Sequence, residues 1–504
     1  MAESAENIIP VHQWEAHDKS DSINDIKGRR SQELIIGLCG AIGSGIKTLK
    51  EQTIYCLKQN GYHVEHVRVS DLISEITRVS TTTLSSFDRY NKLQDLGDNL
   101  RENHKNFICA ELAILKIQVL REKIYGTDNP EITKNTKKTA YIIDQIKHPA
   151  EVELLNQVYK NNFYLVGLLR TVAERIQNLR DEGIKEEDVQ KIIERDRKSL
   201  NKFGQQVEET LQLSDYFIKN LDTEVMKESV LRFIDLIHGA NNITPSKDES
   251  GMYAAYSASL GSACLSRQVG ASIMDVAGNI IATGRNDVPQ YGGGLYTSES
   301  NKDRRCFNKN GCHNDKHKAL LKKEITGILQ KLKLSDSESI AEEIMKETKA
   351  KYLIEYSRAV HAEMDAIVSL ARNTNMGTTG NTLYCTTYPC HVCARHIVAA
   401  GLKRVVYIEP YEKSLALQLH DDTICQTDQS PAPDKVLFEN FEGVAPKRYA
   451  KFFGYHRKRK DAQGKPITYT VEESYHVDTQ YLDSYSDYES KVVQNVKGKF
   501  QLQD

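Results

Sequence analysis

Short apolar runs recur through the first half of the chain, and longer stretches with the 3.6-residue spacing of amphipathic helices separate them. Strands that are apolar throughout, alternating with helices, predict a parallel α/β sheet covered on both faces. Residues 71–135 are expected to be largely helical and to cover this sheet. The expected strands span residues 33–39, 63–68, 140–143, 163–169 and 215–219.

The second half predicts a different order of elements. A helix over residues 252–264 should precede a strand at 266–274 and its hairpin partner at 279–284. A further helix is expected over 352–372, because apolar residues recur there with helical spacing. The last expected elements are a buried strand at 382–387, a helix at 390–400 and a strand at 404–408.

These patterns divide the 504 residues into two domains and three polar segments. The polar segments are expected to be flexible tails and a linker, because they lack periodicity and contain turn-forming residues. The expected boundaries are a tail at 1–32, a first domain at 33–240, a linker at 241–251, a second domain at 252–460 and a tail at 461–504.

Composition limits the partners and the cellular compartment to be expected for the protein. A net charge of −2 gives no overall attraction to nucleic acid or to acidic membranes. The ten cysteines show no disulfide-like framework, which suits a reducing compartment. The N-terminus is polar, without a signal peptide, and no apolar run approaches the roughly twenty residues of a membrane span. We therefore expect a cytoplasmic protein without membrane contact.

The strongest chemical signal is His361-Ala362-Glu363, followed by Pro389-Cys390-His391-Val392-Cys393. This pattern is typical of zinc deaminases that act on nucleobases. His361, Cys390 and Cys393 would bind Zn²⁺ and leave a fourth tetrahedral position for water. Glu363 would be the catalytic acid and base rather than a ligand. A structural zinc knuckle is the alternative, but such a site is expected to have a fourth protein ligand.

A second motif follows the first expected strand. The glycine-rich turn Gly40–Gly45 lies between a strand and a helix, which is the setting of a phosphate-binding loop. Ile46 occupies the place of the usual lysine, so nucleotide binding is predicted here without phosphoryl transfer. A structural domain without a ligand remains the alternative. The candidate nucleotide-binding residues are Gly40, Gly43, Ser44, Gly45, Lys47 and Thr48.

Two stretches of the second domain resemble the CMP/dCMP deaminase family, namely residues 266–270 and 283–289. By that resemblance Asn286 is expected to contact the sugar of a nucleotide substrate. Tyr388 matches the deoxycytidylate type, in which this position lies beside the base. The alternatives are that Asn286 caps a turn and that Tyr388 is a packed aromatic residue.

Residues 295–350 interrupt the second domain between its hairpin and its zinc-binding helix. Four potential ligands occur there, and some dCMP deaminases have a second metal site. The spacing is loose, so surface thiols and solvated histidines are the favoured interpretation. Residues 316–349 are amphipathic and charged, which predicts a helical cover or an oligomer contact. The four potential ligands are Cys306, Cys312, His313 and His317.

A kinase-like P-loop domain ahead of a dCMP-type deaminase domain resembles the bacterial anti-phage dCTP deaminases. The resemblance covers residues 34–450 and implies a P-loop NTPase-like parallel sheet followed by a cytidine deaminase-like α/β/α domain. It implies conversion of free dCTP, and also dCMP, to the deoxyuridine nucleotides, which starves a phage of dCTP. It also implies, in some members, inhibition by a small RNA. Separately, the intact turn Gly40–Gly45 predicts a regulatory nucleotide at the first domain, and we expect a homo-oligomer.

Three alternatives remain at this level. The first is a dCMP deaminase of pyrimidine metabolism. The second is a polynucleotide cytidine deaminase, which should have a basic groove with stacking aromatic residues. The third is a nucleotide kinase with an inactive deaminase domain, which the missing lysine and the complete zinc set argue against.

Overall fold

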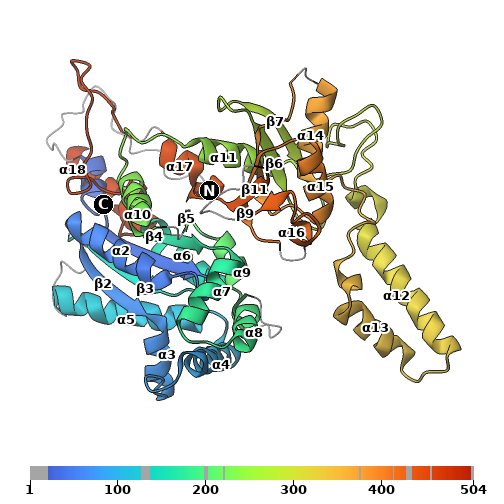
Figure 1. The fold of residues 1–504 in the computed structure, drawn as a ribbon. Coiled ribbons are helices and arrows are strands. Elements are labelled where there is room, and N and C mark those ends of the chain that lie inside the picture. The colour runs from blue at the N-terminus through green and yellow to red at the C-terminus, as the bar shows by residue number, and fades with distance from the viewer. Residues whose placement is uncertain are drawn as a thin grey trace, which may run out of the picture.

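The computed structural model describes residues 21–126, 137–197, 203–219, 222–373, 376–411, 414–426, 434–454, 457–478 and 480–500. Within these residues the chain forms two six-stranded sheets, each with its own layers of helices (Figure 1). We call the part built on the N-terminal sheet the first body and the part built on the C-terminal sheet the second body. A long helical hairpin extends from the second body, away from the first. No helix in the described ranges is both long and apolar enough to cross a membrane.

The first sheet has the strand order β12-β5-β4-β1-β3-β2. Its five N-terminal strands are parallel, as the apolar runs predicted, and β12 is antiparallel to β5. Every residue of β1 and β4 is buried, which explains why these strands are apolar throughout. The strands are β1 (Glu33–Gly40), β2 (His63–Arg68), β3 (Thr139–Asp144), β4 (Phe163–Leu169), β5 (Tyr216–Lys219) and β12 (Gly443–Val444).

Helices cover both faces of this sheet. α2 (Ile46–Gln59) and α10 (Thr223–Ile237) pack on one face through the core that contains Leu49 and Phe233. The opposite core includes residues of α3, α5, α6 and α9, and α7 and α8 form a smaller cluster around Ile42. The bounds are α3 (Val69–Thr77), α4 (Ser86–His104), α5 (Ile108–Tyr125), α6 (Pro149–Tyr159), α7 (Val172–Asp181), α8 (Glu186–Arg197) and α9 (Val207–Gln212).

The second sheet has the order β10-β11-β9-β8-β6-β7. β6 pairs antiparallel with both β7 and β8, whereas β8, β9, β11 and β10 are parallel to one another. The expected hairpin and both strands around the zinc motif are therefore present. The strands are β6 (Gly270–Met274), β7 (Ile280–Arg285), β8 (Thr382–Thr387), β9 (Arg404–Glu409), β10 (Ile424–Cys425) and β11 (Val436–Asn440).

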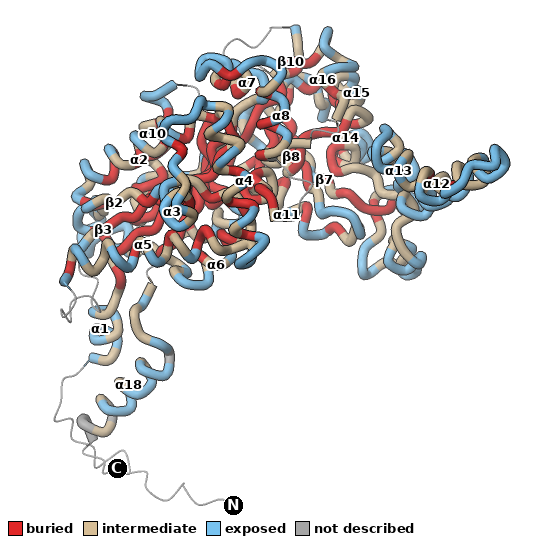
Figure 2. The backbone as a smooth tube through the Cα atoms, turned by 90° about the horizontal axis from the view of Figure 1, so that it is seen from below, coloured by how far each residue is buried: buried red, intermediate tan, exposed pale blue. Residues whose placement is uncertain are grey.

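One face of the second sheet carries the helices that follow the zinc motif residues. α14 (Ala362–Asn373), α15 (His391–Ala399) and α16 (Ala416–Leu419) pack there, and α11 (Lys247–Ser259) packs on the other face. α12 (His313–Lys331) and α13 (Ser337–Glu347) form the projecting hairpin. Figure 2 shows the buried residues concentrated in the two sheets, while this hairpin is mostly exposed or half-buried.

Two expected helices begin elsewhere. The helix expected from residue 352 begins at Ala362, because the amide of Val360 forms a bridge to the carbonyl oxygen of Asp287 and holds the preceding chain extended. α11 begins at Lys247, inside the expected linker. Ser246 and Glu249 form a capping box there, which satisfies free N–H groups of the first turn.

The two bodies share a continuous interface. β12 lies in the expected second domain but extends the first sheet beside β5. Asp215 accepts a hydrogen bond from Arg448 at 2.7 Å, and Lys219 forms an ion pair with Glu439 at 2.6 Å. Met252 and Phe441 belong to the same buried core as residues of β1 and β4. The halves therefore form one packed unit.

The expected tails also contain ordered structure. α1 (Ser22–Lys27) contacts α18 (Tyr485–Phe500), and Arg29 pairs with Asp483 at 2.5 Å. His476 is buried against the first body, where its ring contacts Tyr62. Residues 1–20 and 501–504 of the expected tails lie outside the described residues.

Candidate zinc centre and its cavity

Three potential zinc ligands come together at the ends of two helices. His361 directly precedes α14, and its carbonyl oxygen accepts the amide of Asp365 at 2.9 Å. Cys390 caps α15, and its sulfur accepts the amide of Cys393 at 3.5 Å. Pro389 lies just before the cap residue, and the helix begins at His391, one residue after the expected start. Each ligand is fixed by a helix terminus that packs on the second sheet.

The distances within this group suit a zinc ion. Nδ1 of His361 lies 3.4 Å from the sulfur of Cys390 and 3.4 Å from that of Cys393. Zn–N and Zn–S bonds of about 2.0 and 2.3 Å with tetrahedral angles would separate nitrogen and sulfur by about 3.6 Å. The donor set of one imidazole and two sulfurs therefore fits zinc, with Nδ1 as the histidine ligand atom.

Electrostatics favour a thiolate at this site. Hydrogen bonds from Cys393 and the His361 ring lower the pKa of Cys390 to about 4. The hydrogen bond with Cys390 in turn raises the pKa of His361 to about 9. A zinc ion replaces the protons of such ligands, because it binds thiolate and neutral imidazole.

Glu363 lies in the first turn of α14, two residues after His361, with 4% of its surface exposed. Burial raises its pKa above that of an exposed glutamate, and the neighbouring His361 ring opposes part of this rise. A carboxyl group with a raised pKa can both accept and donate a proton near neutral pH.

His361, Glu363 and Cys390 line one cavity of about 210 Å³. Asn286 and Tyr388 line the same cavity, so all six residues expected at this site except Cys393 are in its wall. Cys393 is buried directly behind, in contact with His361. The lining is mostly apolar, which suits a heterocycle held by a few directed polar groups.

Asn286 and Tyr388 are both held firmly. The Asn286 amide accepts from the Val269 amide at 2.7 Å and donates to the Arg267 carbonyl oxygen at 2.8 Å. One amide hydrogen and one lone pair remain for another partner. Tyr388 packs edge-on against Tyr407 and Phe438. Each residue therefore has a packing role and a surface toward the cavity.

A polar chain at the cavity was not expected from the sequence. Thr387 donates to Glu409 at 2.8 Å, and the same carboxylate pairs with Arg267 at 3.0 Å. Arg267 and Thr387 line the zinc cavity. Arg267 also lines a cleft of about 400 Å³ against Glu208, Glu209 and Leu213 of the first body. Only the tertiary fold reveals this position between the two bodies.

The four potential ligands of the inserted segment do not gather around a second metal. Cys306, Cys312 and His313 line the zinc cavity, while the His317 ring stacks on Tyr356. Throughout the described ranges, His361, Cys390 and Cys393 are the one group of three or more whose ligand atoms converge. The inserted segment instead supplies part of the cavity wall.

The glycine-rich turn borders a separate cavity of about 570 Å³ in the first body. Gly43 and Gly45 have φ angles of 78° and 92°, which glycine adopts without strain. Gly43, Ser44, Gly45 and Lys47 line the cavity. Gly40 ends β1 behind the turn, and Thr48 follows in α2. Ile46 is buried in the core, which leaves Lys47 as the exposed cation of the turn.

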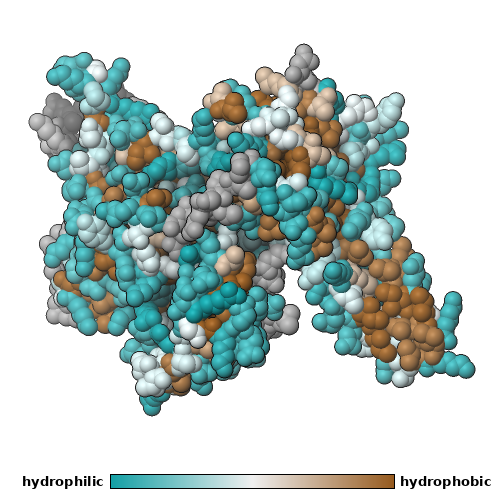
Figure 3. Space-filling model, viewed as in Figure 1, coloured by the Kyte–Doolittle hydropathy of each residue, from teal (hydrophilic) through white to brown (hydrophobic). Residues whose placement is uncertain are grey.

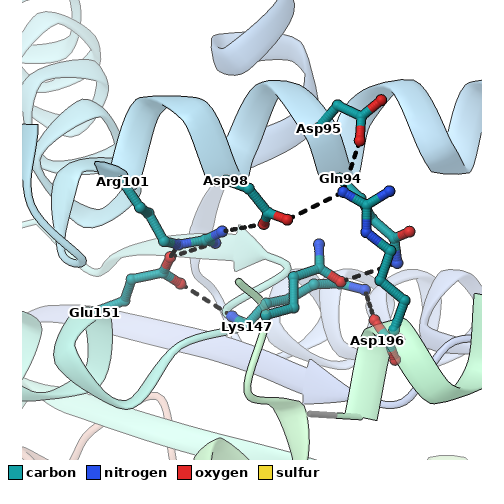
Figure 4. A network of polar contacts seen from close by, with 9 residues as sticks. Gln94, Asp95, Asp98, Arg101, Lys147, Glu151 and Asp196 are labelled. Atoms are coloured by element: carbon teal, nitrogen blue, oxygen red, sulfur yellow. Dashed lines mark hydrogen bonds and ion pairs between the residues drawn. The ribbon is translucent and has the colours of Figure 1, made fainter. Parts of the chain in front are cut away.

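An internal carboxylate already contacts this turn. Asp196 of α8 accepts the Ile42 amide at 2.7 Å and pairs with Lys147 at 2.5 Å. Figure 4 shows Asp196 and Lys147 beside a buried network in which Arg101 pairs with Glu151 at 2.8 Å. Gln94, 3% exposed, lines the cavity with a buried Oε1 that has no hydrogen-bond partner in the described structure.

Residues 245–409 match the family model for the cytidine and deoxycytidylate deaminase zinc-binding region. The chain is 44% identical over 55 residues to deoxycytidylate deaminase of Enterobacteria phage T2, which is 11% of this chain and 29% of the relative. ComE operon protein 2 of Bacillus subtilis is 41% identical over 56 residues, 11% of this chain and 29% of the relative. The chain thus spans less than a third of these relatives' length.

One solved structure gives a further comparison. The apo dCMP deaminase of the cyanophage S-TIM5 is 21% identical, with a TM-score of 0.23 over 40% of this chain and 100% of that one. The family match shows that the second body contains a zinc-binding region of the cytidine deaminase type, in which His361, Cys390 and Cys393 fit Zn²⁺.

Proposed function

We propose that this protein is a zinc-dependent deaminase of free deoxycytidine nucleotides, converting dCTP, and also dCMP, to the deoxyuridine nucleotides. One observation carries the proposal: Glu363 and two of the three zinc ligands, His361 and Cys390, line the same small cavity as Asn286 and Tyr388. The residue pattern, the family match and this convergence agree on cytosine chemistry.

The reaction needs a proton carrier beside the cytosine ring. Zinc held by His361, Cys390 and Cys393 would activate a water molecule as the nucleophile at neutral pH. Glu363 would accept one proton from this water and donate it to the ring nitrogen while the water oxygen adds to C4. Glu363 would then take the remaining proton of the added hydroxyl group and pass it to the amino group, so that the C4–N bond breaks and ammonia leaves. The sum is dCTP and water giving dUTP and ammonia.

The cavity wall favours a small substrate over a polynucleotide. Part of that wall comes from the two ends of the projecting hairpin, namely Cys306, Cys312, His313 and Asn314 before it and Ile354, Ser357, Arg358 and Ala359 after it. Asn286 would contact the sugar, Tyr388 would lie beside the base, and Arg267 would place a cation near the phosphates. A single-stranded substrate would instead need a basic groove with stacking aromatic residues.

We further propose that the first body binds a regulatory nucleotide. Its cavity is lined by cations that include Lys47, Lys50 and Arg68, and by the buried amide of Gln94. Such an arrangement suits phosphates at the glycine-rich turn and a base at the amide. Phosphoryl transfer is not proposed, because Ile46 is buried where a lysine should reach the phosphates.

The fold offers a route between the two cavities. Lys147 lines the first cavity, and its carbonyl oxygen accepts the amide of Gln206 at 2.9 Å, just before α9. Glu208 and Leu213, at α9, face Arg267, which also lines the zinc cavity. A nucleotide that moves Asp196 and Lys147 would therefore act on Arg267 through α9.

The biological setting is proposed from the resemblance to anti-phage dCTP deaminases. Deamination would lower dCTP during infection, and a small RNA would hold the enzyme inactive until then. Cells expressing the wild-type chain should lose dCTP after infection, while cells expressing Glu363→Gln should keep it. Equal dCTP pools in both strains would contradict the defence role.

Purified protein incubated with dCTP, dCMP, CTP and single-stranded DNA tests the proposed chemistry. Ammonia and uracil products are expected with dCTP and dCMP, and not with Glu363→Gln. If single-stranded DNA were the only substrate to give product, the polynucleotide alternative would be established. If dCMP were the only one, the protein would be a dCMP deaminase.

A further inference from the structure

The hairpin of α12 and α13 projects from the second body (Figures 1 and 2). The two helices pack against each other, and an ion pair joins Lys322 to Glu342. The hairpin is a separate arm whose outer surfaces face solvent in the single chain.

One face of this arm is apolar. Leu320, Ile328 and Leu332 have 52%, 57% and 66% of their surface exposed. Leu332 caps the C-terminus of α12, and at 100° per residue the three positions fall within about a third of the circumference of the helix. Figure 3 shows apolar residues gathered over the arm in one broad patch. An exposed apolar patch of this kind marks an interaction surface.

The two helices carry opposite charge. α12 contains five lysines and two acidic residues, which gives a net charge of +3. α13 contains four glutamates and one lysine, which gives −3. Exposed Lys323 and Glu343 are examples from the two helices. A partner that covers the apolar face should therefore be negative beside α12 and positive beside α13.

We propose that the partner is the same arm of a second copy of this chain. Two arms facing each other about a twofold axis along their length form a four-helix bundle. In that arrangement α12 of each chain lies beside α13 of the other, and all neighbouring helices are antiparallel. Helices of like charge lie at diagonally opposite corners of the bundle. The arrangement therefore buries the apolar faces and places each helix beside helices of opposite charge.

The arm is connected directly to the zinc cavity. Cys312 and His313, where α12 begins, line the cavity, and so do Ile354 and Arg358, which follow the arm. Pairing of the arms therefore restrains one wall of the cavity. This consequence rests on the proposed deaminase function, whereas the pairing itself does not.

Sedimentation and light scattering of the full-length protein over a range of concentrations test the pairing. Ile328→Glu with Leu332→Glu should raise the dissociation constant of one interface at least about 100-fold, because charge enters the apolar face. Ile76→Glu is the matched control, since Ile76 on α3 is also 57% exposed. A wild-type monomer at all concentrations, or an unchanged mass in the double variant, would overturn the proposal.

A charge exchange tests the arrangement without disturbing apolar packing. Lys323→Glu and Glu343→Lys should each weaken the assembly, and the two together should restore it, because charges of opposite sign then meet again. Recovery in the double variant supports the antiparallel α12–α13 contact, and further weakening would contradict it. Mass and zinc content are measured on the same samples. The test of arm pairing can therefore be interpreted even if the protein shows no deaminase activity.

Discussion

The carbonyl oxygen of Asp287 accepts a hydrogen bond from the amide of Val360 at 2.9 Å. Asp287 directly follows Asn286 after β7, and Val360 directly precedes His361. This single bridge ties the expected sugar contact to the first zinc ligand. The buried Asp287 carboxylate also accepts the amides of Ala263 and Val288, at 3.0 and 2.8 Å.

Replacement of Asp287 by alanine keeps the bridging carbonyl group but removes the carboxylate that fixes the chain on either side of it, so both the fold and the zinc site should be weakened. One buried and one part-buried amide lose their acceptor, which should lower the free energy of unfolding by about 2–4 kcal/mol. Zinc affinity should fall about 10- to 100-fold, as for other residues that position ligands. Denaturant titration and zinc competition measure the two effects. Exposed Asp71→Ala is the control, and identical curves for both variants would contradict this role.

Replacement of Cys390 or Cys393 by serine should remove most of the bound zinc, because serine is a poor zinc ligand at neutral pH. Elemental analysis should find one zinc per wild-type chain and well under half of that in each variant. Cys312→Ser is the matched control in the same cavity wall, and it should keep its zinc. Two zinc ions per chain, with one lost on changing Cys312, would show a second metal site instead.

The stability of the protein should decline as pH falls from about 6.5 toward 4. Burial lowers the pKa of His238 to about 4 and also lowers that of His476, and the cations Lys138 and Arg457 add to both shifts. In the unfolded chain histidine takes up a proton near pH 6.5, while in the folded chain His238 stays neutral down to about pH 4.

For His238 alone this linkage should cost about 2 kcal/mol between neutral pH and pH 5. Tyr62 contacts both rings, so the loss should release the C-terminal segment from the first body. Urea unfolding at pH 7.5 and pH 5 measures the effect. His476→Phe should show a smaller fall in stability between the two pH values, and an equal fall would contradict the account.

The strand core of the first sheet was predictable from the sequence, because β1 and β4 are largely apolar runs whose burial follows from composition alone. The zinc-binding residues were predictable because their spacing in the sequence follows from the start of α14 and from one turn of α15. The start of α14 was not, since Leu353, Ile354 and Val360 continue the helical spacing while the bridge to Asp287 overrides it.

Some other features can be recognised only in the tertiary structure, and one has a local sequence signal that the hydrophobic periodicity does not show. The capping box of Ser246 and Glu249 could have placed the start of α11 from sequence. β12 has two residues, too few for any periodicity, and only its pairing with β5 shows that it completes the first sheet. The contact of Arg267 with both bodies likewise joins residues remote in sequence.

Lys47→Ala should weaken nucleotide binding to the first body about tenfold, through the loss of one charge-assisted contact. Lys58→Ala, an exposed lysine on the same helix α2, is the control. Gly43 is a poor test position, because a Cβ there would lie 2.7 Å from the Arg175 carbonyl oxygen.

Titration of ATP, dATP and dTTP into the Glu363→Gln background measures this binding without turnover. The bound nucleotide should also change deamination in the active protein, with a coupling free energy of about 1–3 kcal/mol. Absence of binding by all three nucleotides at millimolar concentration would end the proposal for the first body.

The central claim is that Glu363 and the zinc group deaminate free deoxycytidine nucleotides. Its most direct test is the release of ammonia from dCTP and dCMP by wild-type protein and by Glu363→Gln, each with its zinc content measured. One ammonia and one deoxyuridine nucleotide per substrate consumed are expected, with the rate falling at least about 10²–10⁴-fold in the variant while zinc is retained. Near-normal turnover by zinc-loaded Glu363→Gln, or no ammonia from either nucleotide with zinc-loaded wild-type protein, would contradict it.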